Sequence, residues 1–320
     1  MLDTTSFGPH LFSEDAIDPE TAAFLKQLQE LIAQEVPINE QEPAAVRAAR
    51  ESGQGRAGPV VLSDMARERT IPGPAGDITL RTFIPETVNG VYLHIHGGGW
   101  VIGRAHLQDP RLESIARNCS VAILSVDYRL APEHPYPAGP DDCEAAALWL
   151  SKNAASEFGT DKLVIGGESA GAQLSAVTLL RMRDRHGFTG FSGANLLYGA
   201  FDLTGSPSCV NWGDRNLVLS TASMNWFYDH FVPVERRRDP DVTPLFADLR
   251  GMPPALFTVG TMDPLIDDTL FMHARWVSSG NKGELAVYPG GVHGFNSQPI
   301  ALAERANAKI DDFIRSAVAR

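Results

Sequence analysis

The chain has 320 residues, with 27 Lys and Arg against 39 Asp and Glu, so its formal net charge is −12. This acidic balance argues against nucleic acid and against anionic membrane surfaces as partners, because both require a basic binding face. Apolar residues make up 43% of the chain and charged residues 21%, which is typical of a soluble globular protein with one sizeable core.

The N-terminal region predicts a cytoplasmic protein that begins with helices. Its first residues are acidic and lack the basic region and apolar stretch of a signal peptide. No apolar run approaches the roughly 20 residues that cross a bilayer. Asp18-Pro19-Glu20 opens a helix whose apolar stripe is Ala22, Leu25, Leu28, Ile32 and Val36. A second short helix is expected from Pro43 to Glu51, so residues 1–55 form a helical segment rather than a domain.

From about Pro59 onward, short runs rich in Val, Ile and Leu alternate with helical stretches. The predicted strands are Ile78–Ile84, Val91–His96, Val121–Asp127, Leu163–Gly167, Asn195–Tyr198, Ala255–Gly260 and Glu284–Tyr288. The predicted helices are Leu107–Asn118, Asp141–Ala155, Ala170–Arg185, Pro264–Ser279 and Pro299–Ala317. This alternation predicts an α/β protein with a mostly parallel central sheet flanked by helices, over residues 56–320. An aromatic-rich insertion interrupts the rhythm at about 201–252.

The three cysteines, Cys119, Cys143 and Cys209, are widely spaced and form no CxxC pair. We therefore expect buried free thiols rather than a disulfide framework or a metal site.

A GxSxG pattern stands at the end of a predicted strand. Gly167-Glu168-Ser169-Ala170-Gly171 follows the strand and precedes a helix, which is the setting in which this motif presents a nucleophilic serine. The glycines are expected to permit a sharp turn that exposes the Ser169 hydroxyl. The alternative is a Gly/Ser turn in which Ser169 only caps the helix.

A run of three glycines follows an earlier strand, in His96-Gly97-Gly98-Gly99-Trp100. Because consecutive glycines are costly in backbone entropy, we interpret them as a loop whose amides approach a ligand. Loops of the HGGG type supply oxyanion donors, together with the amide of the residue after the nucleophile, here Ala170. A phosphate-binding loop is the alternative, but the spacing fits neither of the common phosphate motifs.

His293 is the best candidate for the base, because it follows the last predicted strand in a glycine-rich loop. A solvated loop histidine is the alternative. Asp263 follows the preceding strand and is the best candidate for the orienting acid, although it is also placed to cap a helix. Asp267 and Asp268 are rivals that fall inside that helix. The order Ser169, Asp263, His293 is the one expected of a catalytic triad on this fold.

Together these residues resemble the hormone-sensitive-lipase-like branch of the α/β-hydrolases, whose bacterial members are carboxylesterases. The resemblance runs from about Ile78 to the C-terminus and includes the stretch Asp127–Ala138, DYRLAPEHPYPA. It implies that this stretch braces the floor of the active site and that Gly98 and Gly99 donate with Ala170 to the oxyanion. It also implies a helical cap built from the N-terminal segment and the insertion. The chain departs from the family at Glu168, where Asp or Thr is usual, and at Ala172, where Gly is frequent.

The predicted reaction is ester hydrolysis through an acyl-enzyme, with Ser169 as nucleophile, His293 as base and Asp263 orienting the imidazole. It needs no metal or organic cofactor. An amidase, deacetylase or lactonase with the same triad is a first alternative, and a non-catalytic small-molecule receptor on the same scaffold is a second.

The substrate is expected to be a small-molecule ester with a small to medium acyl group, bound in an apolar pocket. Candidate pocket residues are Trp100, Trp212, Trp226 and Phe227, for which packing within the cap is an equally good interpretation. Exposed edge strands would also allow two subunits to pair, so a homodimer is an open alternative.

Overall fold

The structure is a computed structural model that describes residues 7–54 and 58–319. Within these residues the chain forms one eight-stranded sheet in the order β1-β2-β4-β3-β5-β6-β7-β8. The strands are β1 Arg67–Gly73, β2 Gly76–Phe83, β3 Gly90–Ile95, β4 Val121–Val126, β5 Leu163–Glu168, β6 Phe191–Leu197, β7 Ala255–Met262 and β8 Gly283–Val292. Strands β3 to β8 run parallel, whereas β2 pairs antiparallel with both β1 and β4. The predicted mostly parallel sheet is confirmed.

The central strands are buried on both faces. Every residue of β3 and of β4 is buried, as expected for continuous apolar runs such as Val121–Val126 between two layers of helices. Strand β1 was not predicted, because it lies at the sheet edge and Ile71 is its one buried residue. An edge strand with charged, exposed side chains gives no apolar signal in the sequence.

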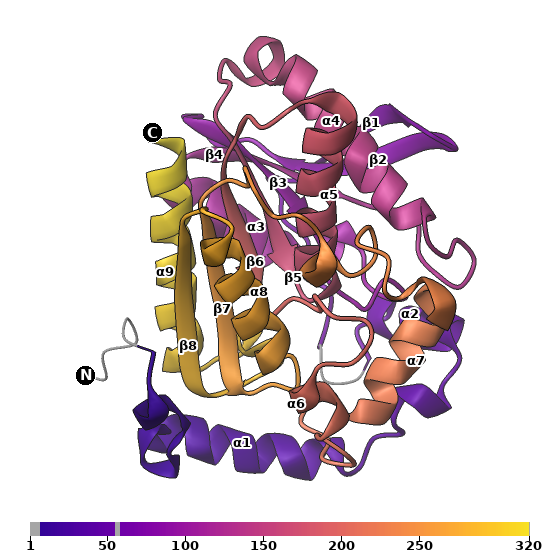
Figure 1. Cartoon of the computed structure of the whole chain (residues 1–320), viewed down its shortest axis with the longest axis vertical. Coiled ribbons are helices and arrows are strands. Elements are labelled where there is room, and N and C mark those ends of the chain that lie inside the picture. Colours follow the sequence, from indigo (N-terminus) through magenta and orange to yellow (C-terminus); the bar gives the residue numbers. More distant parts are fainter. Residues whose placement is uncertain (1–6, 55–57, 320) are drawn as a thin grey trace.

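Helices cover both faces of the sheet (Figure 1). They are α1 Pro19–Ile32, α2 Pro43–Glu51, α3 Asp109–Cys119, α4 Ala138–Phe158, α5 Ala170–His186, α6 Pro207–Val210, α7 Thr221–Phe231, α8 Ile266–Ser278 and α9 Ala301–Val318. Helices α3 and α9 pack together on one face, and α4, α5 and α8 lie on the other. Each predicted helix is present, with ends that differ by a few residues.

Helix α1 begins where the sequence predicts and ends earlier. The Asp18 side chain accepts the amide of Thr21 at 2.9 Å, a cap that satisfies one free N–H of the first turn. The predicted apolar stripe is wrong at both ends. Ala22 is exposed, and Val36 lies beyond the end of the helix with 60% of its surface exposed.

Two regions stand apart from the alternating strands and helices. The N-terminal segment carries α1 and α2, and the insertion at 201–252 carries α6 and α7. Figure 1 shows α1 along the lower end of the molecule, with α6 and α7 at the same end. The predicted boundary at residue 55 falls outside the described residues.

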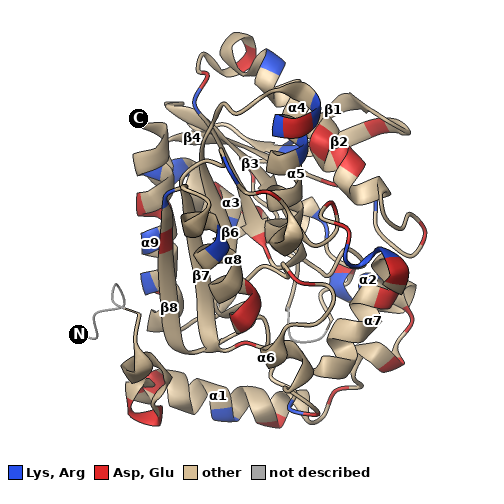
Figure 2. Ribbon diagram, viewed as in Figure 1, with Lys and Arg blue, Asp and Glu red and all other residues tan. Residues whose placement is uncertain are grey.

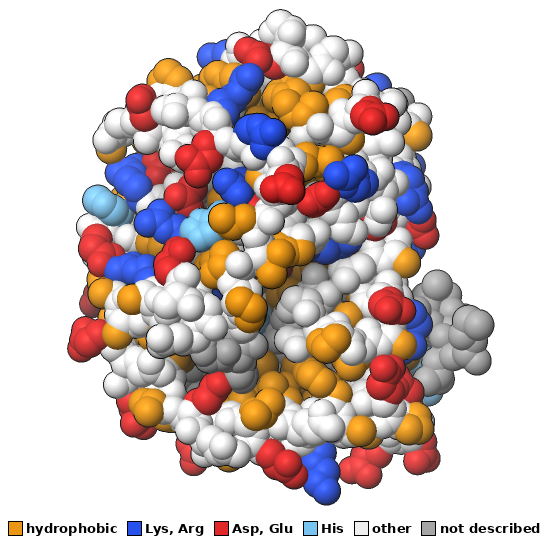
Figure 3. Space-filling view, turned by 180° about the vertical axis from the view of Figure 1, so that it is seen from behind, with side chains coloured by type: hydrophobic (Ala, Val, Ile, Leu, Met, Phe, Trp, Pro, Cys, Tyr) orange, Lys and Arg blue, Asp and Glu red, His pale blue; other side chains and the backbone are white. Residues whose placement is uncertain are grey.

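Charges of both signs are mixed over the surface. Lys and Arg alternate with Asp and Glu along the described ribbon (Figure 2). On the reverse face, apolar side chains are scattered among charged ones and gather toward the lower centre of the view (Figure 3). In the described part of the chain, no helix is both long and apolar enough to cross a membrane. The three cysteines are buried and free, as predicted.

Candidate active site

Ser169 lies between the end of β5 and the start of α5, at the carboxyl edge of the sheet. Its backbone has φ 57° and ψ −121°, a strained conformation for a residue with a side chain. The Ser169 amide donates to the carbonyl of Leu197 at 2.9 Å, which ties the turn to the neighbouring strand β6. The predicted sharp turn from strand to helix is therefore present.

The two glycines of the motif have a different role from the one expected. The strain lies at Ser169 itself, and neither Gly167 nor Gly171 has a positive φ. A Cβ on either glycine would lie 1.9 Å from the carbonyl oxygen of Ile95. These positions need glycine because the end of β3 approaches the turn at backbone distance.

The structure brings the three predicted triad residues into one hydrogen-bonded chain. The Ser169 hydroxyl donates to His293 Nε2 at 2.8 Å, and His293 Nδ1–H donates to Asp263 Oδ2 at 2.8 Å. Asp263 is fully buried, and its other oxygen accepts the amide of Leu265 at 2.9 Å. With both carboxylate oxygens engaged, the Asp263 side chain can turn neither away from the imidazole nor toward solvent.

The rival carboxylates are held elsewhere. Asp267 accepts the amide of Ser208 at 2.8 Å, and Asp268 accepts the amide of Asp202 at 2.7 Å. Asp267 and Asp268 therefore face the inserted region. Asp263 is the carboxylate that contacts His293.

The glycine loop is folded tightly beside the serine. Gly98 has φ 114°, and a Cβ there would lie 1.9 Å from the carbonyl oxygen of Ile102, so only glycine fits. Gly99 has φ 59° and lies under the ring of Phe227, whose Cδ1 would be 2.1 Å from an added Cβ. Ala170 begins α5, so its amide lies at the positive end of the helix dipole. Gly98 and Gly99 therefore lie in a closely packed loop, and Ala170 lies at the first turn of α5.

The stretch after β4 contacts this loop directly. The Tyr128 hydroxyl donates to the carbonyl of His96 at 2.9 Å, and the Ala131 amide donates to the carbonyl of Trp100 at 2.9 Å. The segment Asp127–Ala138, which is part of the family resemblance, is therefore hydrogen-bonded to both ends of the glycine loop.

Comparison with known proteins decides the family. The family described as alpha/beta hydrolase fold matches residues 92–297. The chain belongs to it. The resemblance to the hormone-sensitive-lipase-like branch and the predicted fold are thereby confirmed.

Relatives and solved structures extend the match over most of the α/β-hydrolase chain. Carboxylic ester hydrolase LipN of Mycobacterium tuberculosis is 33% identical over 74% of this chain and 66% of its own length. Carboxylesterase NlhH of the same species is 33% identical over 78% of this chain and 82% of its own. An esterase of Pyrobaculum calidifontis superposes with a TM-score of 0.84 at 30% identity, over 95% of this chain and all of that one.

In this α/β-hydrolase, two predicted pocket aromatics are packed against the glycine loop. Trp100 is 2% exposed, stacks on Phe231 at 4.5 Å and donates from its indole N–H to Gln173 at 2.9 Å. These contacts favour the packing interpretation for Trp100. Phe227 is buried as well, and its ring lies against Gly99 of the glycine loop.

The other two aromatics are half-buried. Trp212 packs under the guanidinium of Arg215 at 4.7 Å. Trp226 makes an edge-on contact with Phe227 at 5.1 Å. Both belong to the inserted region, and their ring contacts are with residues of that region.

Two further contacts near the site were not predicted, because no sequence motif marks the residues that make them. Glu168 accepts hydrogen bonds from the Gly97 amide and from His94, each at 3.0 Å. The ring of Tyr198 packs on His293 at 4.7 Å and its hydroxyl donates to Asn296 at 2.5 Å. The one available signal was the departure at Glu168 from the residue usual in the family.

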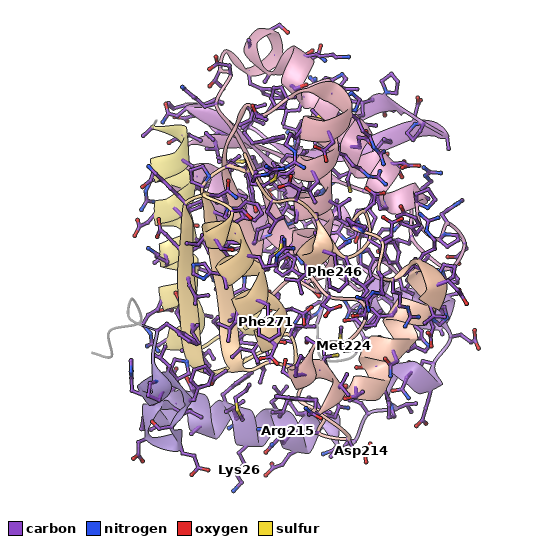
Figure 4. The ribbon with its side chains drawn as sticks, in the orientation of Figure 1. Lys26, Asp214, Arg215, Met224, Phe246 and Phe271 are labelled. Atoms are coloured by element: carbon purple, nitrogen blue, oxygen red, sulfur yellow. The ribbon has the colours of Figure 1, made fainter. Side chains whose placement is uncertain are left out.

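One surface hollow of the described residues lies away from Ser169, Asp263 and His293. It has a volume of about 560 Å³ and is lined by Leu245, Phe246, Phe271, Ala274 and Arg275. Figure 4 shows Phe246 and Phe271 near one another on the side of α8. None of the predicted site residues lines it.

Proposed function

We propose that this α/β-hydrolase is a serine carboxylesterase acting on small to medium acyl esters. The observation that carries the proposal is the continuous chain from Ser169 Oγ through His293 to Asp263, with 2.8 Å at both hydrogen bonds. The names of the relatives, carboxylic ester hydrolase and carboxylesterase, support the same bond class.

In the proposed first step, His293 Nε2 takes the hydroxyl proton as Ser169 Oγ attacks the ester carbonyl. Asp263 holds the tautomer that carries the proton on Nδ1 and stabilises the imidazolium that forms. His293 then gives its proton to the leaving alcohol. In the second step a water molecule replaces the alcohol, and the same transfers release the acid and free Ser169.

The amides of Gly98, Gly99 and Ala170 are proposed to bind the oxyanion of each tetrahedral intermediate. Each donor contributes on the order of 3 kcal/mol to the transition state when it is already oriented. The close packing around Gly98 and Gly99 supports such orientation, because the loop backbone has no room to relax.

We also propose that the N-terminal segment and the insertion at 201–252 form a cap over the catalytic domain. Residue Gly290, close before His293, packs against α1 so tightly that an added Cβ would lie 2.7 Å from Thr21. At the other end, Arg47 of α2 donates to the carbonyl of Val101 at 3.0 Å. The N-terminal segment thus reaches both the base loop and the glycine loop.

Replacement of the nucleophile tests the proposed reaction. Ser169→Ala is expected to lower kcat on p-nitrophenyl acetate by roughly 10⁴-fold or more while circular dichroism stays unchanged. An ester series from acetate to octanoate, with one amide and one lactone, assigns the bond class. Full activity of the variant, or turnover of the amide or lactone alone, would contradict the proposal.

The cap proposal has a separate test in Phe227, a residue of α7 whose ring lies against Gly99. Phe227→Ala opens space beside the oxyanion loop and is expected to move the preferred acyl chain from shorter to longer esters. If the folded variant shows the same activity profile over acyl-chain length as wild type, the hypothesis that the insertion limits acyl size is wrong.

A further inference from the structure

Glu168 lies directly before the nucleophile, at the end of β5, and its carboxylate joins two neighbouring strands. One oxygen accepts the Gly97 amide at 3.0 Å, and the other accepts His94 Nε2–H at 3.0 Å. The side chain is 18% exposed, so water does not compete freely for either bond. Neither contact is used by the proposed acyl transfer.

The Glu168 carboxylate is itself held in place from behind. His94 Nδ1 forms a hydrogen bond with the Ser125 hydroxyl at 2.8 Å, and both residues are buried. Since both ring nitrogens of His94 are occupied, the ring cannot flip or tilt away from Glu168. A side chain fixed at both ends makes a rigid support for Glu168.

Both backbone polar atoms of Gly97 are hydrogen-bonded, so the peptide planes before and after this residue are each held by a side chain. Its N–H donates to Glu168, and its carbonyl accepts His96 Nδ1–H at 2.8 Å. The His96 ring is stacked on Tyr128 at 4.3 Å, so this second contact is also fixed. A Cβ at Gly97 would lie 2.7 Å from the Glu168 carbonyl oxygen, so the end of β5 packs directly against this residue. The orientation of Gly97 sets the direction in which the next amides, those of the oxyanion loop, point.

The Glu168 carboxyl is ionised in this environment. Burial opposes ionisation, but the interactions with His94 and with the Gly97 amide outweigh burial and lower the pKa of Glu168 below its ordinary value. An ionised oxygen accepts an amide hydrogen more strongly than a neutral one.

We propose that Glu168 is a positioning residue that holds the oxyanion loop in its active orientation through the Gly97 amide. It touches no reacting atom, and it acts through the direction of the Gly98 and Gly99 amides. The proposal rests on the proposed function, because an oxyanion loop needs orientation only where Ser169 attacks an electrophilic centre.

Two replacements of equal length separate the acceptor oxygen from the bulk of the side chain. Glu168→Gln keeps an oxygen for the Gly97 amide, and its NH₂ group can face His94 once the imidazole proton moves to Nδ1 and points at Ser125. We expect kcat within about threefold of wild type. Glu168→Met fills the same space without an acceptor. We expect kcat to fall roughly tenfold to a hundredfold, which is less than the loss for a deleted oxyanion donor. We expect KM to stay within about twofold of wild type.

A matched control removes a different side-chain bond to the same strand. Ser192 on β6 donates to the carbonyl of Leu163, at the opposite end of β5, at 2.9 Å. Ser192→Ala is expected to leave kcat unchanged. If Glu168→Met does not fold, as judged by its melting temperature, Glu168→Ala takes its place with the same expected loss.

The rate of Ser169 phosphonylation by a fluorophosphonate gives a second readout, because it uses the same nucleophile and oxyanion hole without needing an ester. The proposal requires that this rate and kcat fall together in Glu168→Met and recover in Glu168→Gln. Equal rates in the Met variant and wild type, or equal losses in the Met and Gln variants, would overturn it. A wild-type chain that is phosphonylated but hydrolyses no ester would refute the proposed function alone, and the phosphonylation rates would still decide the role of Glu168.

Discussion

Asp268 is a fully buried carboxyl on α8 that stands outside the triad and faces the inserted region. Its Oδ1 accepts the amide of Asp202 at 2.7 Å. Burial raises the pKa of Asp268 to about 8, although the hydrogen bond from the Asp202 amide opposes the shift. Asp268 is therefore protonated at neutral pH in the folded chain and ionised in the unfolded chain.

This difference makes folding stability depend on pH with a defined sign. The folded pKa lies above the unfolded value of 3.8, so the contribution of Asp268 is fully present below that value and is lost as pH rises toward about 8. Between the two values the folded state holds one more proton than the unfolded state, and the free energy of unfolding falls by about 1.4 kcal/mol per pH unit. Over the whole window the loss from this group is about 6 kcal/mol.

Asp268→Asn tests the assignment, because asparagine mimics the protonated carboxyl and still accepts the Asp202 amide. Urea unfolding of both proteins at pH 5, 6, 7 and 8 gives the free energy of unfolding, and subtraction cancels the groups that they share. The free energy of unfolding of the variant minus that of wild type is expected to rise by about 1.4 kcal/mol per pH unit from pH 5 to pH 7. Parallel curves for the two proteins would show that Asp268 is ionised in the folded state, and the reasoning would be refuted.

Two further predictions concern the site itself. Asp263→Asn keeps the acceptor for its local amide but places an NH₂ group against His293 Nδ1, so the imidazole proton moves to Nε2 and the base is lost. We expect kcat on p-nitrophenyl acetate to fall roughly 10⁴-fold with the melting temperature little changed, and a loss below tenfold would contradict the assigned tautomer. Gly98→Ala forces a Cβ against the carbonyl of Ile102 and should lower kcat at least about 100-fold. Gly159→Ala, at a positive φ with open space around it, is the control: it should lose only about 1 kcal/mol of stability and no activity.

The triad could be predicted because each member directly follows a strand. The carboxyl ends of β5, β7 and β8 meet at one edge of the sheet, so Ser169, Asp263 and His293 converge once the strands are assigned in a parallel sheet. Strand β1 was missed for the opposite reason, because a charged edge strand carries no apolar pattern.

The contacts that orient the site could not be read from the sequence. Glu168 and His94 are 74 positions apart, and their bond depends on the pairing of β3 with β5, in which His94 lies opposite Gly166. The sequence marks Glu168 as unusual but does not say what it contacts. Trp100 shows the same limit, because an aromatic residue beside a glycine loop suits a pocket as well as it suits a packed core.

Of the five non-glycine residues with a positive φ in the described chain, three lie where the chemistry is proposed, and Ser120 and Val218 lie elsewhere. Trp100, Ser169 and Tyr198 have φ values of 62°, 57° and 33°, in a region that costs of order 1–3 kcal/mol for a residue with a side chain. Each is held by a backbone hydrogen bond to a neighbouring segment: the Trp100 carbonyl accepts the Ala131 amide, the Ser169 amide donates to the end of β6, and the Tyr198 amide donates to the middle of β7. Because the surrounding buried strands fix these partners, the strained residues cannot relax without breaking the sheet edge. The rigid sheet therefore stabilises a serine, a base and a glycine loop in orientations that none of their local sequences would adopt alone.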